Sequence, residues 1–158
     1  MHKTKSAQDL IKKGDAKHAL EILKPLSLSL QRESSYWTQS ANAQMQLHKY
    51  NDALQALNTA WLYSSTPEIC YLKAKCYEMQ SQYLMAEEEY QLASQLEPMR
   101  MRPYMALMKL YQKIDEFEKA SLMAQYLITF KPKIESSNAK KYKEQASLLL
   151  ARNRPLNF

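Results

Sequence analysis

Few residues of this sequence could bind a metal ion or act as a nucleophile. Its three histidines, His2, His18 and His48, are scattered, and Cys70 and Cys76 lie six positions apart. On one helix that separation is roughly 9 Å along the axis, which is too far for a disulfide and does not converge on a metal ion. We therefore expect free thiols, no metal site and a reducing compartment.

Phosphate binding and hydrolysis are not indicated either. A phosphate-binding loop needs clustered glycines at a helix start, whereas Gly14 is the only glycine. No glycine-bordered nucleophile or distinctive catalytic motif is present. Glu87, Glu88 and Glu89 are consecutive, so on a helix they point about 100° apart and do not form a cation cage. We predict that the chain is not an enzyme and binds no cofactor.

The composition and spacing of the chain indicate that these residues lie on helices. The chain has 158 residues, of which 46% are apolar and only one is glycine, and this composition favours helix throughout and no sheet. Four alanines, Ala19, Ala53, Ala86 and Ala120, are separated by 34, 33 and 34 residues. Such a period predicts a repeated helical hairpin, and hairpins must stack because one alone cannot bury both of its faces.

The third copy, residues 67–100, carries the pattern most clearly. Small and aromatic residues follow one another at helical spacing and proline closes the copy: Ala74, Tyr77, Tyr83, Ala86, Tyr90, Ala93 and Pro98. Alanines allow two helices to approach closely, while tyrosines fill the space beside the crossing. This unit resembles the tetratricopeptide repeat, a family of 34-residue helical hairpins.

The resemblance implies an all-α fold, a right-handed superhelical stack of about four hairpins with a C-terminal capping helix. We expect one domain over residues 1–158, with repeats at about 1–33, 34–66, 67–100 and 101–134 and the cap at about 137–151. Pro25 should interrupt the second helix of the first repeat. Ser34 or Ser35 and Thr66 are predicted helix N-caps.

The first helix of each hairpin should line the inner curve of the stack, and we predict that this surface binds a protein or peptide partner. Methionine and tyrosine mixed with polar side chains suit a groove that accepts a peptide. The simpler alternative is that these are ordinary solvated positions. The groove residues are Thr38, Asn42, Met45, Tyr71, Lys75, Glu78, Met79, Arg102, Met105, Lys109 and Gln112.

The clamp that some tetratricopeptide proteins use for chaperone C-terminal carboxylates is incomplete here. Asn42 and Arg102 match it, whereas Thr38, Leu72 and Ala106 do not. The resemblance therefore does not imply that function.

Charge is unevenly distributed along the chain. The formal net charge is +6, but residues 67–98 carry −4 and residues 133–158 carry +4. A basic end could bind nucleic acid or an anionic surface, although it lacks the interleaved aromatic residues of a base-stacking surface and could be a solvated helix face. The basic residues are Lys133, Lys140, Lys141, Lys143, Arg152 and Arg154.

Residues 90–141 also resemble the soluble tetratricopeptide region of bacterial O-antigen ligase or polymerase-like membrane proteins. The likeness rests on Pro98-Met99-Arg100, Pro103-Tyr104, Lys109-Leu110-Tyr111 and Lys133-Ile134-Glu135-Ser136. It implies a non-catalytic appendage of a membrane protein. A secretion chaperone of the tetratricopeptide type is the alternative.

No apolar run is long enough to span a bilayer, and the first residues lack a signal-peptide core. We expect a soluble, cytoplasmic chain, or a membrane-associated or periplasmic one if it is a fragment of a membrane protein.

Overall fold

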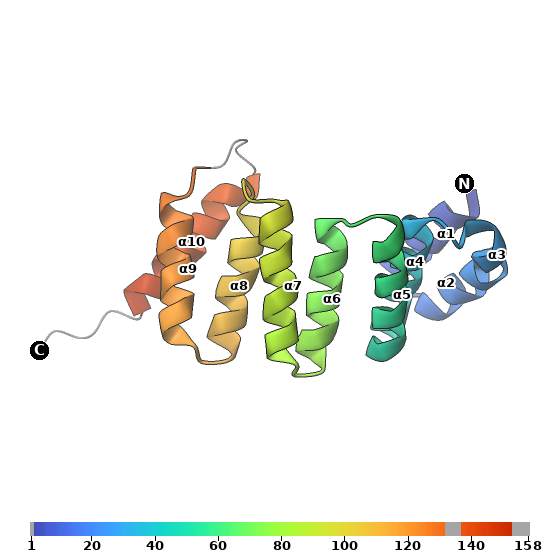
Figure 1. The fold of residues 1–158 in the computed structure, drawn as a ribbon, viewed down its shortest axis with the longest axis horizontal. Coiled ribbons are helices and arrows are strands. Elements are labelled where there is room, and N and C mark those ends of the chain that lie inside the picture. The colour runs from blue at the N-terminus through green and yellow to red at the C-terminus, as the bar shows by residue number, and fades with distance from the viewer. Residues whose placement is uncertain (1, 132–136, 153–158) are drawn as a thin grey trace, which may run out of the picture. The chain divides into compact units, whose positions relative to one another are not determined.

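The computed structural model describes residues 2–131 and 137–152, and within these ranges every regular element is a helix (Figure 1). The helices form two compact units, Met1–Ala86 and Glu87–Phe158, and the boundary falls inside α7. The predicted all-helical composition is confirmed for the described residues. Some residues named above lie outside the described ranges: Lys133, Ile134, Glu135, Ser136 and Arg154.

The first unit contains the helices α1 His2–Lys12, α2 Ala16–Leu23, η1 Lys24–Leu26, α3 Ser27–Leu30, α4 Ser34–Gln46, α5 Tyr50–Tyr63 and α6 Pro67–Met79. Helix α7, Tyr83–Leu96, belongs to both units, and the second unit continues with α8 Arg102–Lys113, α9 Phe117–Thr129 and α10 Ser137–Arg152.

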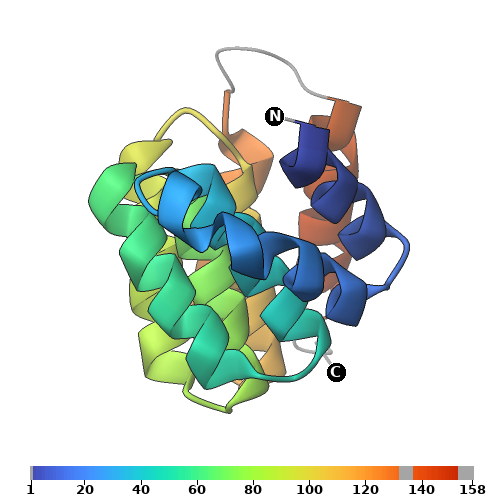
Figure 2. The same cartoon turned by 90° about the vertical axis from the view of Figure 1, so that its right-hand side faces the viewer.

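Antiparallel hairpins build the first unit. Helix α1 packs on α2, α4 packs on α5, and the two hairpins meet where α4 contacts both α1 and α2 (Figures 1 and 2). Helix α6 then packs against α5 and also contacts α4. Helix α4 is therefore covered on several sides and lies between the first and third repeats.

The repeated alanines occupy equivalent places in their helices. Ala19, Ala53, Ala86 and Ala120 are each the fourth residue of a hairpin's second helix, and each is 0% exposed. The backbone N–H of each one donates to the carbonyl of the residue just before its helix, at 2.9–3.1 Å. The 34-residue period thus reflects one local geometry, in which a methyl group is all that the helix crossing admits.

The turns inside the hairpins repeat with the same period. Gly14, His48, Ser81 and Asp115 have φ values of 84°, 59°, 59° and 60°, the left-handed conformation that ends many helices. After each of them, the next residue's N–H donates to the carbonyl five positions earlier at 2.9 Å, for example Asp15 to Leu10. Each turn therefore satisfies the last carbonyls of its helix, although three of the four positions hold residues with side chains.

The interruption expected at Pro25 is confirmed, because α2 ends at Leu23 and a 3-10 turn carries the proline. The expectation that Ser34 or Ser35 caps the next helix is wrong. Both serines lie inside α4, and Glu33, in extended conformation, precedes the helix without a side-chain capping bond. Thr66 does precede α6 with Pro67 in the first turn, but its side chain makes no capping bond.

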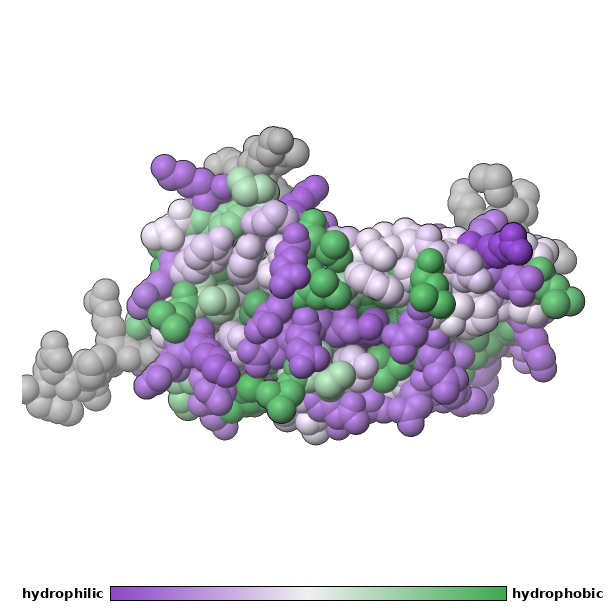
Figure 3. All heavy atoms as spheres, in the orientation of Figure 1, coloured by the Kyte–Doolittle hydropathy of each residue, from purple (hydrophilic) through white to green (hydrophobic). Residues whose placement is uncertain are grey.

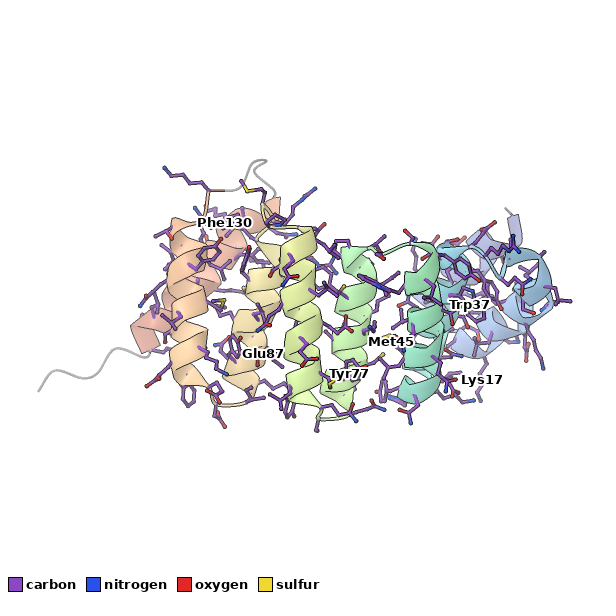
Figure 4. The ribbon with its side chains drawn as sticks, in the orientation of Figure 1. Lys17, Trp37, Met45, Tyr77, Glu87 and Phe130 are labelled. Atoms are coloured by element: carbon purple, nitrogen blue, oxygen red, sulfur yellow. The ribbon has the colours of Figure 1, made fainter. Side chains whose placement is uncertain are left out.

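In the second unit α9 packs between α8 and α10. Tyr104, Tyr126 and Phe130 form an aromatic cluster with ring centroids 4.7–5.6 Å apart. Tyr111 of α8 donates through its hydroxyl to Glu87 Oε1 of α7 at 2.7 Å (Glu87 is labelled in Figure 4). Helix α10 packs on α9, and its residues Ala146 and Leu149 are buried, as expected of a capping helix.

Candidate functional site: a groove along α4

An apolar cavity of about 320 Å³ lies in the first unit where α1, α4 and α6 come together. Met45 and Leu72 are half-buried and pack against the core formed by α4, α5 and α6 while also lining this cavity (Met45 is labelled in Figure 4). Met79 is 55% exposed at its wall. The lining is completed by Ile11, Asn42, Gln46, Tyr50 and Lys75. The volume is at the low end of those that hold small ligands or single large side chains.

A second, polar cavity of about 780 Å³ lies beside the first. It follows α4 toward its beginning, where Ser34 and Ser35 line it together with Glu68 at the start of α6. Its remaining lining is Gln8, Ile11, Lys12, Thr38, Gln39, Asn42, Gln46, Ser64 and Thr66.

The two cavities belong to one groove, which we call the α4 groove. Ile11, Asn42 and Gln46 line both cavities, so no element separates them. The lining residues of α4 run from Ser34 to Gln46, which is about 18 Å at the rise of an α-helix. An extended chain of about five or six residues has that length.

Hydrogen bonds hold the walls of the α4 groove in place. Gln46 Nε2 donates to the carbonyl oxygen of Ile11 at 2.7 Å and so ties the end of α4 to α1. Thr38 Oγ1 donates to the carbonyl of Ser34 at 2.9 Å, which occupies its proton within its own helix. Asn42 makes no side-chain hydrogen bond within the part of the chain that the structure describes, so its amide is available in the middle of the groove.

The charges in the α4 groove are mainly positive. Lys75 lines the apolar cavity and Lys12 lines the polar one, and Glu68 is the only acidic residue among the lining residues. Neither lysine has an ion-pair partner among residues 2–131 and 137–152. Their charges are therefore not neutralised by these parts of the protein.

Five of the seven predicted groove residues in the first unit lie together in the α4 groove: Thr38, Asn42, Met45, Lys75 and Met79. The other two do not line it. Tyr71 is only 6% exposed, and Glu78 is half-buried.

Sequence reasoning missed the contribution of the first helix. Gln8, Ile11 and Lys12 stand 34 positions before Asn42, Met45 and Gln46, so extending the period by one repeat would have identified them. They were missed because the first repeat lacks the aromatic residues that mark the others.

The predicted groove residues of the second unit are not gathered at one cavity. Lys109 and Gln112 are exposed, and Met105 is buried at 3% exposure. Arg102 lines a cavity of about 270 Å³ with Glu97, Arg100, Met101, Asn138 and Tyr142. The basic residues of α10 are mostly at the surface: Lys140, Lys141 and Arg152 are exposed, and Lys143 is half-buried.

The cysteines are free and buried. Burial raises the pKa of the Cys76 thiol to about 11, so this side chain is a neutral packing group at neutral pH. Within the described ranges no group of three or more His, Cys, Asp or Glu side chains is placed to hold a metal ion. None of the helices there is both long and apolar enough to cross a bilayer.

On the face drawn in Figure 3, polar side chains cover most of the surface and apolar ones form separate spots. The strongly exposed apolar residues include Leu62 of α5 at 81%, Leu84 of α7 at 77% and Leu122 of α9 at 60%.

No protein-family model matches the sequence, and no curated protein matches it. Solved structures do match. A crystal structure of MamA is 18% identical with a TM-score of 0.68 and covers 92% of this chain and 95% of its own. A double mutant of MamA RS-1 is 17% identical with a TM-score of 0.69 and covers 98% of both chains. The Sgt2 TPR domain from Aspergillus fumigatus is 19% identical with a TM-score of 0.59 and covers 79% and 84%. At such identities the likeness shows the fold alone, and it confirms the all-α helical-repeat fold predicted from the 34-residue period.

Proposed function

We propose that the chain is a protein-interaction module and that the α4 groove of its first unit binds a peptide segment of a partner. The observation that supports this is the continuity of the two cavities along α4, through residues that line both. An apolar cavity beside a polar one provides a place for one large side chain and hydrogen-bonding groups for the backbone next to it.

Asn42 has the central role in this proposal. Its amide offers two N–H donors and a carbonyl acceptor, which match the acceptor and donor of a peptide bond. Because it lines both cavities and makes no other side-chain hydrogen bond in the described part of the chain, it can fix the position of the segment.

The module is tested by selecting phage-displayed random peptides against the full chain and measuring the selected peptides by fluorescence anisotropy. We expect Asn42→Ala and Met79→Glu each to weaken binding about tenfold, because the first removes the amide and the second places a charge in the apolar cavity. Leu62→Glu is the matched control, since Leu62 is 81% exposed on α5 and lines neither cavity. Equal loss in all three variants would contradict the assignment to the α4 groove.

The biological setting has two candidates. In one, the chain is the soluble appendage of an O-antigen ligase or polymerase-like protein, supported by the likeness of residues 90–141. In the other, it is a secretion chaperone that holds one unfolded client. Mass spectrometry of peptides that copurify with the full chain distinguishes them, because a single secreted client favours the chaperone and a membrane-assembly protein favours the appendage. The structural matches support neither one over the other.

A further inference from the structure

The α4 groove carries enough chemistry to indicate what kind of segment it takes, and this inference rests on the proposed function. We infer that the α4 groove selects an extended, acidic segment in which a large apolar side chain enters the apolar cavity and acidic side chains flank it.

The apolar part of the segment follows from the lining of the smaller cavity. Ile11, Met45, Leu72 and Met79 contribute aliphatic and thioether groups from three different helices. Met45 and Leu72 are fixed on one side by the core, whereas Met79 is exposed and can change rotamer. A cavity of about 320 Å³ with such walls accommodates one large apolar side chain and tolerates differences in its shape.

The acidic part follows from two lysines near that cavity. Lys75 lines the apolar cavity itself. Lys12 directly follows Ile11, whose carbonyl is bound by Gln46, and Gln46 also lines the apolar cavity. Lys12 is thus placed close to the same end of the groove, and neither lysine is ion-paired in the regions described.

Acidic side chains suit two separate lysines better than a chain terminus does. A peptide has a single α-carboxylate, whereas two acidic side chains can each pair with one of the two ammonium groups. Glu68 lies at the opposite end of the polar cavity, beside Ser34 and Ser35, and disfavours acidic residues there. The preferred segment therefore has its acidic residues around the large apolar residue and neutral or basic residues toward the Glu68 end.

The test uses the peptides selected against the full chain. We expect enrichment of sequences with two acidic residues around one large apolar residue, and binding that weakens as salt is raised. Lys75→Glu should reduce affinity about tenfold and Lys12→Glu by about threefold or more, because each replaces an attraction by a repulsion. Lys17→Glu is the control with the same change in charge, since Lys17 is exposed on α2 and lines neither cavity (Figure 4).

Three results overturn the inference in different ways. Peptides that bind in an Asn42- and Met79-dependent manner, but without acidic enrichment and without a response to Lys12→Glu or Lys75→Glu, overturn the acidic segment and leave the proposed function intact. Peptides whose affinity responds to none of Asn42, Met79, Lys12 or Lys75 overturn both. Loss of binding when the selected peptides are amidated overturns the acidic side chains in a third way, because it would show that a terminal carboxylate is the required acid.

Discussion

The four hairpin turns share one backbone conformation but differ in the residue that adopts it. Gly14 takes the left-handed conformation with no side chain to strain, whereas His48, Ser81 and Asp115 adopt it with a Cβ atom present. The hydrogen bonds of each turn offset the backbone strain of these residues. The left-handed conformation still lowers the stability of the fold by about 1 kcal/mol at each of them. These turns are therefore positions where the stability of the fold can be improved.

We predict that Asp115→Gly and Ser81→Gly each raise the free energy of unfolding by about 0.5–1 kcal/mol, since the strain removed exceeds the added flexibility of the unfolded chain. Urea titration followed by circular dichroism measures the change. Gly14→Ala is the reciprocal control. A Cβ at Gly14 meets nothing within 4 Å, so its expected loss of about 1 kcal/mol comes from the backbone alone. Stabilisation by Gly14→Ala would contradict this account.

Asp15 and His18 make the stability of the first hairpin depend on pH. The Asp15 carboxylate caps α2 by accepting from the His18 N–H at 3.4 Å, and it contacts His18 Nδ1 at 2.6 Å. The hydrogen bond between the side chains raises the pKa of His18 and lowers the pKa of Asp15. Both groups are charged, and the pair is complete, from about pH 4, near the unfolded pKa of aspartate, to about pH 6.5, near that of histidine.

The contribution of this pair to stability should disappear as pH rises through the raised pKa of His18 and as pH falls through the lowered pKa of Asp15. Titration of the His18 ring by NMR tests the coupling. Asp15→Asn retains an N-cap but removes the charge, and we expect it to lower the pKa of His18. An unchanged histidine pKa in that variant would show that the contact is absent in solution.

At the scale of helices, the positions of the hairpins were predictable and the details of their ends were not. The spacing of Ala19, Ala53, Ala86 and Ala120 identified each hairpin's second helix because close packing admits only a small side chain at the crossing. Cap propensity placed the start of α4 wrongly. Trp37 Nε1 donates to the carbonyl of Gln31 at 2.8 Å, a side-chain contact at the entry to α4 that the cap propensity of serine does not take into account.

The candidate site was predictable to a similar degree. Helical periodicity found Asn42 and Lys75 because they are equivalent positions on one face of the first helices, and Met79 was predicted beside that face. It failed at Tyr71, which occupies the position equivalent to Thr38 with a much larger side chain and is buried. Periodicity gives the direction of a Cα–Cβ bond, whereas the depth at which a side chain ends depends on its size and its neighbours.

The contact between α7 and α8 in the second unit leads to a prediction about helix pairing. Burial and then the Glu87 carboxylate raise the pKa of Tyr111 to about 12. Tyr111→Phe removes the hydrogen bond and keeps the ring, which Lys119 approaches to 5.4 Å. We expect a loss of about 2 kcal/mol in unfolding free energy, the range for a hydrogen bond to a charged acceptor.

The same contact predicts that stability depends on pH in the alkaline range. Above about pH 10 the tyrosine of the unfolded chain loses its proton, whereas Tyr111 in the folded chain keeps its own. The free energy of unfolding therefore falls as pH rises through this range. The wild-type chain should therefore lose more stability than Tyr111→Phe between pH 9.5 and 11, which urea titrations at both values measure. Parallel losses in the two proteins would exclude Tyr111 as the source.

At the scale of the whole molecule, the chain forms two compact units that can unfold together or separately. Both tryptophans, Trp37 and Trp61, belong to the first unit, whereas the helices that circular dichroism reports belong to both. Tryptophan fluorescence therefore follows the first unit alone. In stacked repeats stability is approximately a sum of the repeats and their neighbouring interfaces. A substitution that destabilises one unit therefore need not destabilise the other equally.

Leu127→Ala tests this independence. Leu127 is completely buried in α9 of the second unit, and its replacement by alanine should lower the free energy of unfolding by about 2–5 kcal/mol. We expect the urea midpoint seen by circular dichroism to fall more than the midpoint seen by tryptophan fluorescence, because the first unit keeps its own core around Leu57. Leu57→Ala, equally buried in that core, should reverse the order of the two shifts. Identical shifts of both probes in both variants would show that the two units unfold as one, since neither then retains structure after the other is lost.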